Sequence, residues 1–568
     1  MSQETFQMIA TLLGGLAVFI FGMNLMSDGL QKAAGDKMRS ILAMLTRNPV
    51  MGVCAGAIVT AVLQSSSATT VMVIGFVSAG LMKLPQAISV ILGANIGTTI
   101  TAQLIAFQIG DYAWIFVFIG FLMFFFMKKN ERVAEIGQIL FGFGLLFVGI
   151  NTMGDTMKPL AASPFFTELI MNVVDIPVLG VAVGTLMTVV IQSSSATIAV
   201  LQNLASTAGP DGITSIIGLQ GALPILFGDN IGTTITALFA AIGASINAKR
   251  TAVAHTIFNI CGTLIFIWFI PEIAHLITAL SPAGPEVEVI SRQIANSHLL
   301  FNLTNTILFL PLIGILVKIV KTIIPGEEEV KLGDEPIFLD QNVVEQPVFA
   351  THLAIQELAR NASIAFDMIK KSKECFMKED EQIGRDVVET DLIVNKLRTK
   401  TVEYLSQILA AESITDFQKA RVAALLHVAS DIEHIGDYSK NIIMLAGEKA
   451  KNKYEFSDKA MDEIETCFTM IEKMITDTIE CLETGNPELA RKVLATEDKI
   501  NEVEHYIRNE HMQRVGDNVC SPAITVVFLD LIHNIERTGD SCFNIAEAVI
   551  KGYTAKNALK SDEIREYK

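Results

Sequence analysis

Two short polar runs interrupt apolar stretches in the first half of the chain. TAVLQSSSATT covers residues 60–70, and TVVIQSSSATI covers residues 188–198. Hydroxyl and amide groups are costly in an apolar surrounding unless they are paired, so a repeated cluster favours a binding role over helix packing, which is the alternative. Their hydrogens can donate to an anion, while their oxygens can hold a hard cation such as Na⁺. The candidate binding residues are Gln64, Ser65, Ser66, Ser67, Gln192, Ser193, Ser194 and Ser195.

A second repeated motif follows each of these runs. GANIGTTIT covers residues 93–101, and GDNIGTTIT covers residues 228–236. Glycines and threonines at this depth indicate helices that break or pack closely, which is also common in purely structural packing. Asp229 has Ala94 as its counterpart, and an intramembrane carboxylate favours cation coordination or a charge-setting role, with a structural hydrogen bond as the alternative. The neighbours that we add to the candidate site are Asn95, Thr98, Thr99, Asn230, Thr233, Thr234 and Asp229.

A third pair of segments, AHTIFN at 254–259 and SHLLFN at 297–302, places a histidine and an asparagine four residues apart. This spacing puts both side chains on one helix face. No third ligand follows in a recognisable metal-binding pattern, so we expect hydrogen bonds between helices there.

Charge divides the chain into two parts. Residues 1–325 hold 14 basic and 14 acidic side chains, whereas the remaining residues hold 29 and 46 and therefore carry the whole net charge of −17. A soluble domain has about 25% charged residues, so the first part is too poor in charge to be one. Nothing resembles the basic stripe that binding to nucleic acid requires. The sequence predicts a membrane domain followed by an acidic soluble domain.

The apolar runs predict the membrane layout. Seven runs are near the ~20 residues that a spanning helix needs, whereas the arms on either side of each QSSS are only about 15 residues long. We therefore expect re-entrant hairpins with QSSS at their tips, buried in protein or lining a wet cavity. With the tail inside and the N-terminus outside, the cytoplasmic loops hold twelve Lys and Arg residues and the outer loops hold two. The connectors 28–47 and 155–176 then lie on opposite sides, which makes the two copies inverted, as in secondary transporters. The predicted spans are 8–27, 86–107, 112–127, 134–153, 216–243, 251–270 and 293–317.

The acidic part is also duplicated. VVETDLIVNKL (387–397) matches VLATEDKINEV (493–503), and DIEHIGDYSKNI (431–442) matches NIERTGDSCFNI (534–545). Apolar residues spaced by three and four predict amphipathic helices, about three in each half, packed as a bundle. The repeats contain paired carboxylates at i, i+4, which repel each other unless a metal or a basic partner lies between them, and a solvated acidic face is the alternative. The candidate metal ligands are Glu433, Asp437, Glu536 and Asp540.

The membrane motifs resemble the sodium-dependent phosphate cotransporter family, which is related to the type II cotransporters of animals. The resemblance covers residues 8–323 and rests on the paired QSSS runs, the NIGTT segments and the (A/S)HxxFN segments. It implies Na⁺-coupled movement of inorganic phosphate, with the two QSSS tips forming the substrate and sodium sites. Spacing alone would not separate phosphate from sulfate or a carboxylate.

The ExxGD pattern in the tail resembles the PhoU domain, over about residues 350–555. That resemblance implies regulation of phosphate transport or signalling and metal binding through the acidic motifs. His434 in the first copy stands where the second copy has Arg537, which leaves open whether the metal is a divalent or an iron-type ion.

We therefore predict an all-α protein with a polytopic domain of two inverted repeats and a cytoplasmic PhoU-like bundle of two three-helix repeats. The transmembrane domain is placed at residues 1–323, the linker at 324–348 and the PhoU-like domain at 349–568. Within the first, the repeats lie at about 8–127 and 134–270, with an extra helix at about 293–323.

The predicted function is sodium-coupled phosphate transport across the inner (plasma) membrane by alternating access at a midplane site, regulated by the tail. The alternatives are a phosphate exporter that uses the same site and a membrane phosphate sensor that moves nothing. No nucleophile, acid–base dyad or nucleotide loop indicates an enzyme, and no cofactor is required beyond Na⁺ as coupling ion and the metal of the tail. The expected partners are phosphate, Na⁺ and the lipid bilayer but no nucleic acid, with a homodimer and cytoplasmic phosphate-signalling proteins left open.

Overall fold

The chain is described here from a computed structural model. It describes residues 3–34, 48–78, 80–107, 110–127, 130–161, 176–209, 211–326, 334–411, 414–517, 520 and 522–554. Parts of both connectors, of the linker and of the C-terminal end therefore lie outside the described residues. Within them the named elements are all helices, and the sole β feature is an isolated bridge between Ala208 and Ser215. The predicted all-α class is confirmed.

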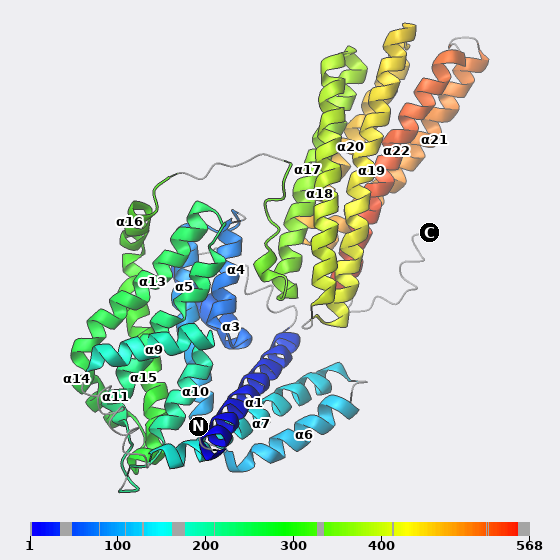
Figure 1. The fold of residues 1–568 in the computed structure, drawn as a ribbon. Coiled ribbons are helices and arrows are strands. Elements are labelled where there is room, and N and C mark those ends of the chain that lie inside the picture. The colour runs from blue at the N-terminus through cyan, green and yellow to red at the C-terminus, as the bar shows by residue number, and fades with distance from the viewer. Residues whose placement is uncertain are drawn as a thin grey trace. The chain divides into compact units, whose positions relative to one another are not determined.

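Two compact units divide the chain, at residues 1–329 and 330–568. Figure 1 shows the fold, with helices labelled where there is room. The helices of the first unit are α1 (Gln3–Ala34), α3 (Pro49–Leu63), α4 (Ser66–Ser78), α5 (Leu84–Ile105), α6 (Ala113–Phe126), α7 (Glu131–Ala161), α9 (Pro177–Ile191), α10 (Ser194–Ala205), α11 (Gly218–Gly232), α12 (Thr234–Ala240), α13 (Ile246–Phe266), α14 (Ile270–Leu280), α15 (Glu286–Phe309) and α16 (Ile313–Ile323), with short 3₁₀ turns at Gly110–Tyr112, Ile267–Phe269 and Leu310–Leu312.

Six helical stretches among the described residues are long and apolar enough to cross a bilayer. They overlap six of the seven predicted spans. The seventh, predicted at 112–127, forms the 14-residue helix α6, which rises about 21 Å and is short of the ~30 Å hydrocarbon core. The crossing stretches are Phe6–Ala34, Leu84–Ile105, Arg132–Thr156, Gly218–Ala240, Ile246–Leu280 and Glu286–Ile323.

The duplication is visible in how the helices pack. In the first copy α3 packs against α5, and in the second copy α9 packs against α11, while α7 packs between α1 and α6. Glycines make the two equivalent contacts: a Cβ at Gly93 would lie 2.0 Å from the Val53 oxygen, and one at Gly228 would lie 2.0 Å from the Val181 oxygen. Close packing through glycine, as predicted, brings these backbones together. The predicted break also occurs, but in the second copy, where α11 ends at Gly232 and α12 begins at Thr234.

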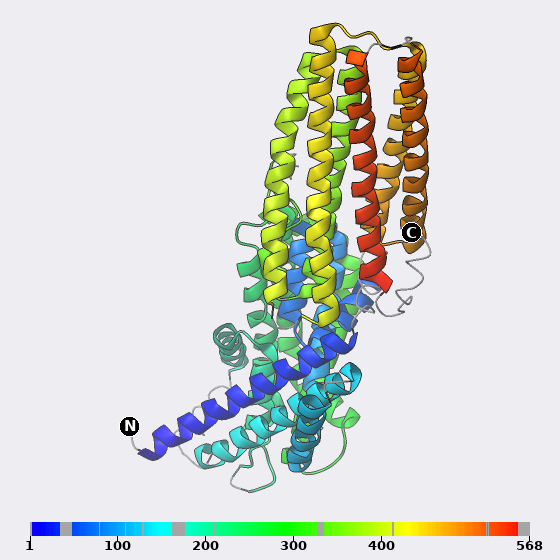
Figure 2. The same ribbon diagram turned by 90° about the vertical axis from the view of Figure 1, so that its right-hand side faces the viewer.

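In its described residues the second unit is a bundle of six long helices (Figure 2). One apolar core, which includes Leu358, Ile432, Phe468 and Leu531, runs through it. Part of the predicted linker belongs to this unit, because the Glu357 carboxylate accepts hydrogen bonds from the backbone of Ile337 and Phe338. The helices are α17 (Pro347–Lys378), α18 (Glu381–Ala410), α19 (Asp416–Asn452), α20 (Asp458–Thr484), α21 (Pro487–Gly516) and α22 (Pro522–Thr554), preceded by a 3₁₀ turn at Gln341–Val343.

The two halves of this bundle are related by an approximate two-fold axis. Helices α19 and α22 pack together, and Asn441 Nδ2 donates to Asn534 Oδ1 at 3.0 Å, while Asn544 Nδ2 donates to Asp431 Oδ1 at 3.0 Å. As the residue number rises along one helix, the number of its partner falls by the same amount along the other. This is expected where two equivalent helices cross antiparallel. Positions in one half can therefore be compared with positions in the other.

Candidate functional site

Each QSSS run forms the turn between two short helices. The first arms, α3 and α9, are both 15 residues long, and the second arms, α4 and α10, have 13 and 12 residues. A 15-residue helix rises about 22 Å, which is less than the ~30 Å apolar core of a bilayer. The helix–turn–helix geometry agrees with the hairpins that the sequence predicts, and their re-entrant placement in a membrane stays a prediction.

The glutamine of each run ends the first arm. Gln64 has φ 51° and Gln192 has φ 55°, so both lie in the left-handed region that non-glycine residues rarely adopt. Such a conformation costs about 1–3 kcal/mol and persists where the surrounding structure enforces it, often at functional sites. Both copies carry this backbone strain at the same point of the motif.

The first serine of each run caps the second arm. Ser65 Oγ accepts from the Ala68 N–H at 3.1 Å, and Ser193 Oγ accepts from the Ala196 N–H at 3.3 Å. Capping of this kind contributes about 1 kcal/mol to a helix. Ser65 and Ser193 were predicted to bind solute, and their structural role was missed, although a serine directly before a helix is the usual signal of a cap.

The remaining serines lie in the first turn of the second arms. Ser66 and Ser195 are buried, and Ser67 and Ser194 are half-buried. Backbone N–H groups at a helix start have no partner within the helix, so this turn can bind an anion together with the hydroxyls. The geometry is that of an uncharged donor cluster at each tip.

Threonines from both NIGTTIT segments reach the first tip. Thr101 Oγ1 donates to Gln64 Oε1 at 2.9 Å, and its counterpart Thr236 has Oγ1 3.0 Å from Ser67 Oγ. Because Thr236 belongs to the second copy, this contact joins the second copy to the first tip. Gln192, in contrast, is exposed. The arms also cross over, since α4 packs against α12 and α10 packs against α5.

A buried carboxylate distinguishes the second copy. Asp229 is 1% exposed, its Oδ1 accepts from the Thr188 hydroxyl at 2.7 Å, and its Oδ2 has no partner. Thr188 also lies 3.1 Å from Thr197 on the second arm, whereas its counterpart Thr60 bonds to Thr69 at 2.8 Å. The motif helix, the first arm and the second arm are thus connected through one carboxylate in the second copy.

The other predicted neighbours bond mainly to their own helices. Asn95 Nδ2 donates to the Ile91 oxygen, while its Oδ1 lies 3.3 Å from His255 Nε2 on α13, a contact between helices as predicted for that histidine. The asparagines of the two HxxFN segments instead donate to the histidine oxygens of their own helices. The threonines of both motifs and Asn230 donate to backbone oxygens three or four residues earlier. These bonds are Thr98 to Ala94, Thr99 to Ile96, Asn230 to Leu226, Thr233 to Asp229 and Thr234 to Ile231.

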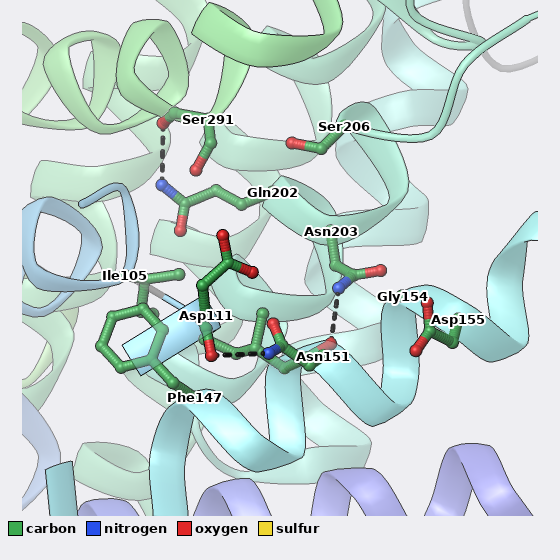
Figure 3. Close-up of a pocket in the computed structure, with 12 residues that line it drawn as sticks. Ile105, Asp111, Phe147, Asn151, Gly154, Asp155, Gln202, Asn203, Ser206 and Ser291 are labelled. Atoms are coloured by element: carbon green, nitrogen blue, oxygen red, sulfur yellow. Dashed lines mark hydrogen bonds between the residues drawn. The ribbon is translucent and has the colours of Figure 1, made fainter. Parts of the chain in front are cut away.

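A cavity of about 410 Å³ is lined by none of the predicted site residues (Figure 3). Gln202 is 1% exposed, its Nε2 donates to the oxygens of Ala102 and Ser291 at 3.2 and 2.9 Å, and its Oε1 has no partner. The Asp111 carboxylate points into the same space. An oxygen-rich lining suits a hydrated cation. Sequence reasoning missed this pocket, although the adjacent amides Gln202 and Asn203 in an apolar arm were a usable signal.

Each predicted metal ligand of the second unit has a basic partner. Glu433 lies 3.2 Å from Arg398 Nε, and Asp437 lies 2.9 Å from Lys440 Nζ. In the second half the partners are on the same helix, since Glu536 lies 3.3 Å from His533 and Asp540 lies 2.7 Å from Arg537. Across the described chain, no three His, Cys, Asp or Glu side chains are arranged to hold a metal ion.

Burial and repulsion act on the acidic groups of the second half. Burial raises the pKa of Glu536, and the nearby Asp540 carboxylate raises it further. Burial likewise raises the pKa of Glu497, where Asp498 and Asp540 add to the effect while a hydrogen bond from Asn501 lowers it. These shifts show that the carboxylates of this half are close enough to influence one another.

The fold and the motifs define a polytopic helical membrane protein with duplicated QSSS and NIGTTIT motifs, joined to a helical second unit. A family model described as Na⁺/Pi-cotransporter matches residues 18–155 and 152–281, and a PhoU domain model matches residues 358–446 and 464–549. The chain belongs to the Na⁺/Pi-cotransporter family, and its second unit is a PhoU domain.

Three relatives illustrate the family. The uncharacterized protein YqeW of Bacillus subtilis is 33% identical over 264 residues, which are 46% of this chain and 83% of YqeW. The putative inorganic phosphate export protein YjbB of Salmonella typhimurium is 23% identical over 544 residues, 95% of this chain and 97% of YjbB. The sodium-dependent phosphate transport protein 2A of Rattus norvegicus is 36% identical over 106 residues, 18% of this chain and 17% of that protein. Their names describe transport and not catalysis where they describe a function.

Proposed function

We propose that the protein moves inorganic phosphate across the inner membrane by coupling it to Na⁺. The observation that carries this proposal is the matched pair of serine-bearing tips, with strained glutamines at Gln64 and Gln192. The relative named as a sodium-dependent phosphate transport protein supports both solutes. The proposed substrate donors are the serine hydroxyls and the free N–H groups at the start of α4 and α10.

Asp229 is proposed to hold a sodium ion or to set the charge of the site. Its Oδ2 has no partner, and a buried carboxylate without a counter-charge is costly. A bound Na⁺ would supply that counter-charge and would offset the charge of phosphate nearby. Alternating access then requires the two hairpins to move relative to the helices around them, with the repeats inverted across the membrane.

Transport directed outward is the second candidate. YjbB, whose printed name describes phosphate export, matches over nearly the full length of both chains and therefore over both units. The motifs do not determine direction, which depends on the gradients and the coupling ion. In either direction we propose that the PhoU domain is cytoplasmic and regulates flux. A divalent or iron-type metal, a homodimer and signalling proteins are the candidate components of that regulation.

The test uses the full-length protein in proteoliposomes loaded with radiolabelled phosphate on one side. An inward Na⁺ gradient, an outward one and no gradient are compared, and flux that follows the Na⁺ gradient is expected. Flux that ignores Na⁺ would remove the coupling from the proposal. Phosphate binding without flux under any gradient would leave a sensor in place of a transporter.

A further inference from the structure

The first half of the PhoU domain carries two basic residues that the second half lacks. Lys440 has Phe543 at the equivalent position, and Arg398 has Glu504. The acidic residues, in contrast, are kept in both halves. The equivalent acidic pairs are Asp391 and Glu497, Glu433 and Glu536, and Asp437 and Asp540.

The Lys440 ammonium lies between carboxylates from two helices. Its Nζ is 2.8 Å from Asp391 Oδ2 on α18 and 2.9 Å from Asp437 Oδ1 on α19. Asp391 is 4% exposed and also accepts from Asn395 at 3.1 Å. Oxygen ligands hold a divalent metal at about 2.0–2.6 Å, so the ammonium occupies nearly the position that such an ion would take.

Arg398 supplies a second positive charge to the acidic side chains of the first half. Its Nε lies 3.2 Å from Glu433 Oε2, so the three carboxylates of the first half face two positive side chains. In the second half, Glu497 bonds to the uncharged amide of Asn501, and Phe543 replaces the lysine. A cavity of about 560 Å³ lies there, lined by Glu497, Asp540 and Phe543 among others.

We infer that Lys440, assisted by Arg398, takes the place of a bound metal ion in the first half of the PhoU domain, so that the Glu433–Asp437 motif holds no metal. A PhoU domain implies a metal at its acidic motifs, and the residues of the first half do not fit one. A divalent ion there would have to displace the ammonium and would then face a second positive charge at Arg398. This inference does not depend on the direction or the coupling of transport.

The test measures hydrogen exchange along the full-length protein in detergent, in EDTA and in buffer with Mg²⁺ or Mn²⁺. In the wild-type protein, peptides of α18 and α19 around Asp391 and Asp437 are expected to exchange equally in all three buffers. Lys440→Met should leave the buried carboxylate of Asp391 without its counter-charge, so exchange of these peptides in EDTA should rise about tenfold to a hundredfold and should fall again in Mn²⁺.

Lys419→Met on the same helix is the matched control, because Lys419 pairs with exposed Asp416 on its own helix. It is expected to behave as the wild type in every buffer. Protection of the wild-type first half by Mg²⁺ or Mn²⁺ would overturn the inference without any variant. An exchange pattern of Lys440→Met equal to that of Lys419→Met would also overturn it.

Discussion

Both units of this protein are duplications, and in each one copy differs from the other in charge. In the membrane unit the second copy has Asp229 where the first has Ala94. In the PhoU domain the first copy has Lys440 where the second has Phe543. The glycine contacts and helix pairs are the same in both copies of the membrane unit. Packing therefore preserves the duplicated scaffold, while a few charged residues distinguish one copy from the other.

The two tips differ in the same way. The first tip is held by Thr101 from its own copy and by Thr236 from the other copy, whereas Gln192 of the second tip is exposed. The second copy has instead the chain of contacts from Thr197 through Thr188 to Asp229. The first tip is therefore fixed by neutral hydrogen bonds, whereas the arms of the second tip are linked to a carboxylate.

The largest effect is expected from Asp229→Ala, which gives the second copy the residue of the first. Phosphate flux should fall about tenfold or more, because a contact to a charged group contributes about 1.5–3 kcal/mol. Flux and its dependence on Na⁺ are measured in proteoliposomes at equal protein content. Glu272→Ala removes an exposed carboxylate and is the control. If both variants transport equally, the carboxylate of Asp229 is structural.

A smaller effect is expected from the serines of the tips. Ser66→Ala and Ser194→Ala should each raise the half-saturating phosphate or Na⁺ concentration about threefold to tenfold, as loss of one hydrogen bond of 0.5–1.5 kcal/mol implies. Ser65→Ala and Ser193→Ala remove caps and should instead lower the stability by about 1 kcal/mol. Concentration-dependent flux and thermal unfolding separate the two results. Normal transport by both Ser66→Ala and Ser194→Ala would mean that the site lies elsewhere.

The smallest effect concerns pH and the two halves of the PhoU domain. His511 is buried, stacks on Phe528 and has Leu405 at the equivalent position of the first half. Burial lowers the pKa of His511, and the Arg514 charge lowers it further. The unfolded chain therefore binds more protons than the folded one below about pH 6.5, so stability is lost as the pH falls from there.

His511→Leu should remove this loss. Hydrogen exchange in α21 and α22 of the full-length protein, corrected for the intrinsic rate, is compared between pH 7 and pH 5. The wild type should lose protection on acidification, and the variant should lose less. Equal losses in the two proteins would show that other groups cause the acid sensitivity.

The sequence predicts the helical class, the duplications and six of the spans because apolar length and repeated motifs are properties of the chain itself. It overestimates the length of the helix predicted at 112–127, because this apolar run begins in a 3₁₀ turn and only 14 residues form α6. It also assigns residues 337–343 to a linker, although Glu357 and Tyr404 hydrogen-bond that segment to the second unit.

The site was harder to predict than the fold. The motifs identify the tips, but the role of each QSSS residue depends on the backbone conformation. That conformation makes Ser65 and Ser193 helix caps. The contact of Thr236 with Ser67 joins residues 169 positions apart, and a single sequence gives no signal for it. Likewise, i, i+4 spacing predicted that Asp437 is a metal ligand, whereas the structure pairs it with Lys440, which also contacts Asp391 on another helix.

The left-handed glutamines have a consequence for engineering. Glycine adopts this backbone conformation without steric cost, so Gln192→Gly is compatible with the turn and would relieve its strain. The chain nevertheless carries a long amide side chain at both turns. Selection for thermal stability alone would favour glycine at these two positions. A screen for more stable variants should therefore also measure transport.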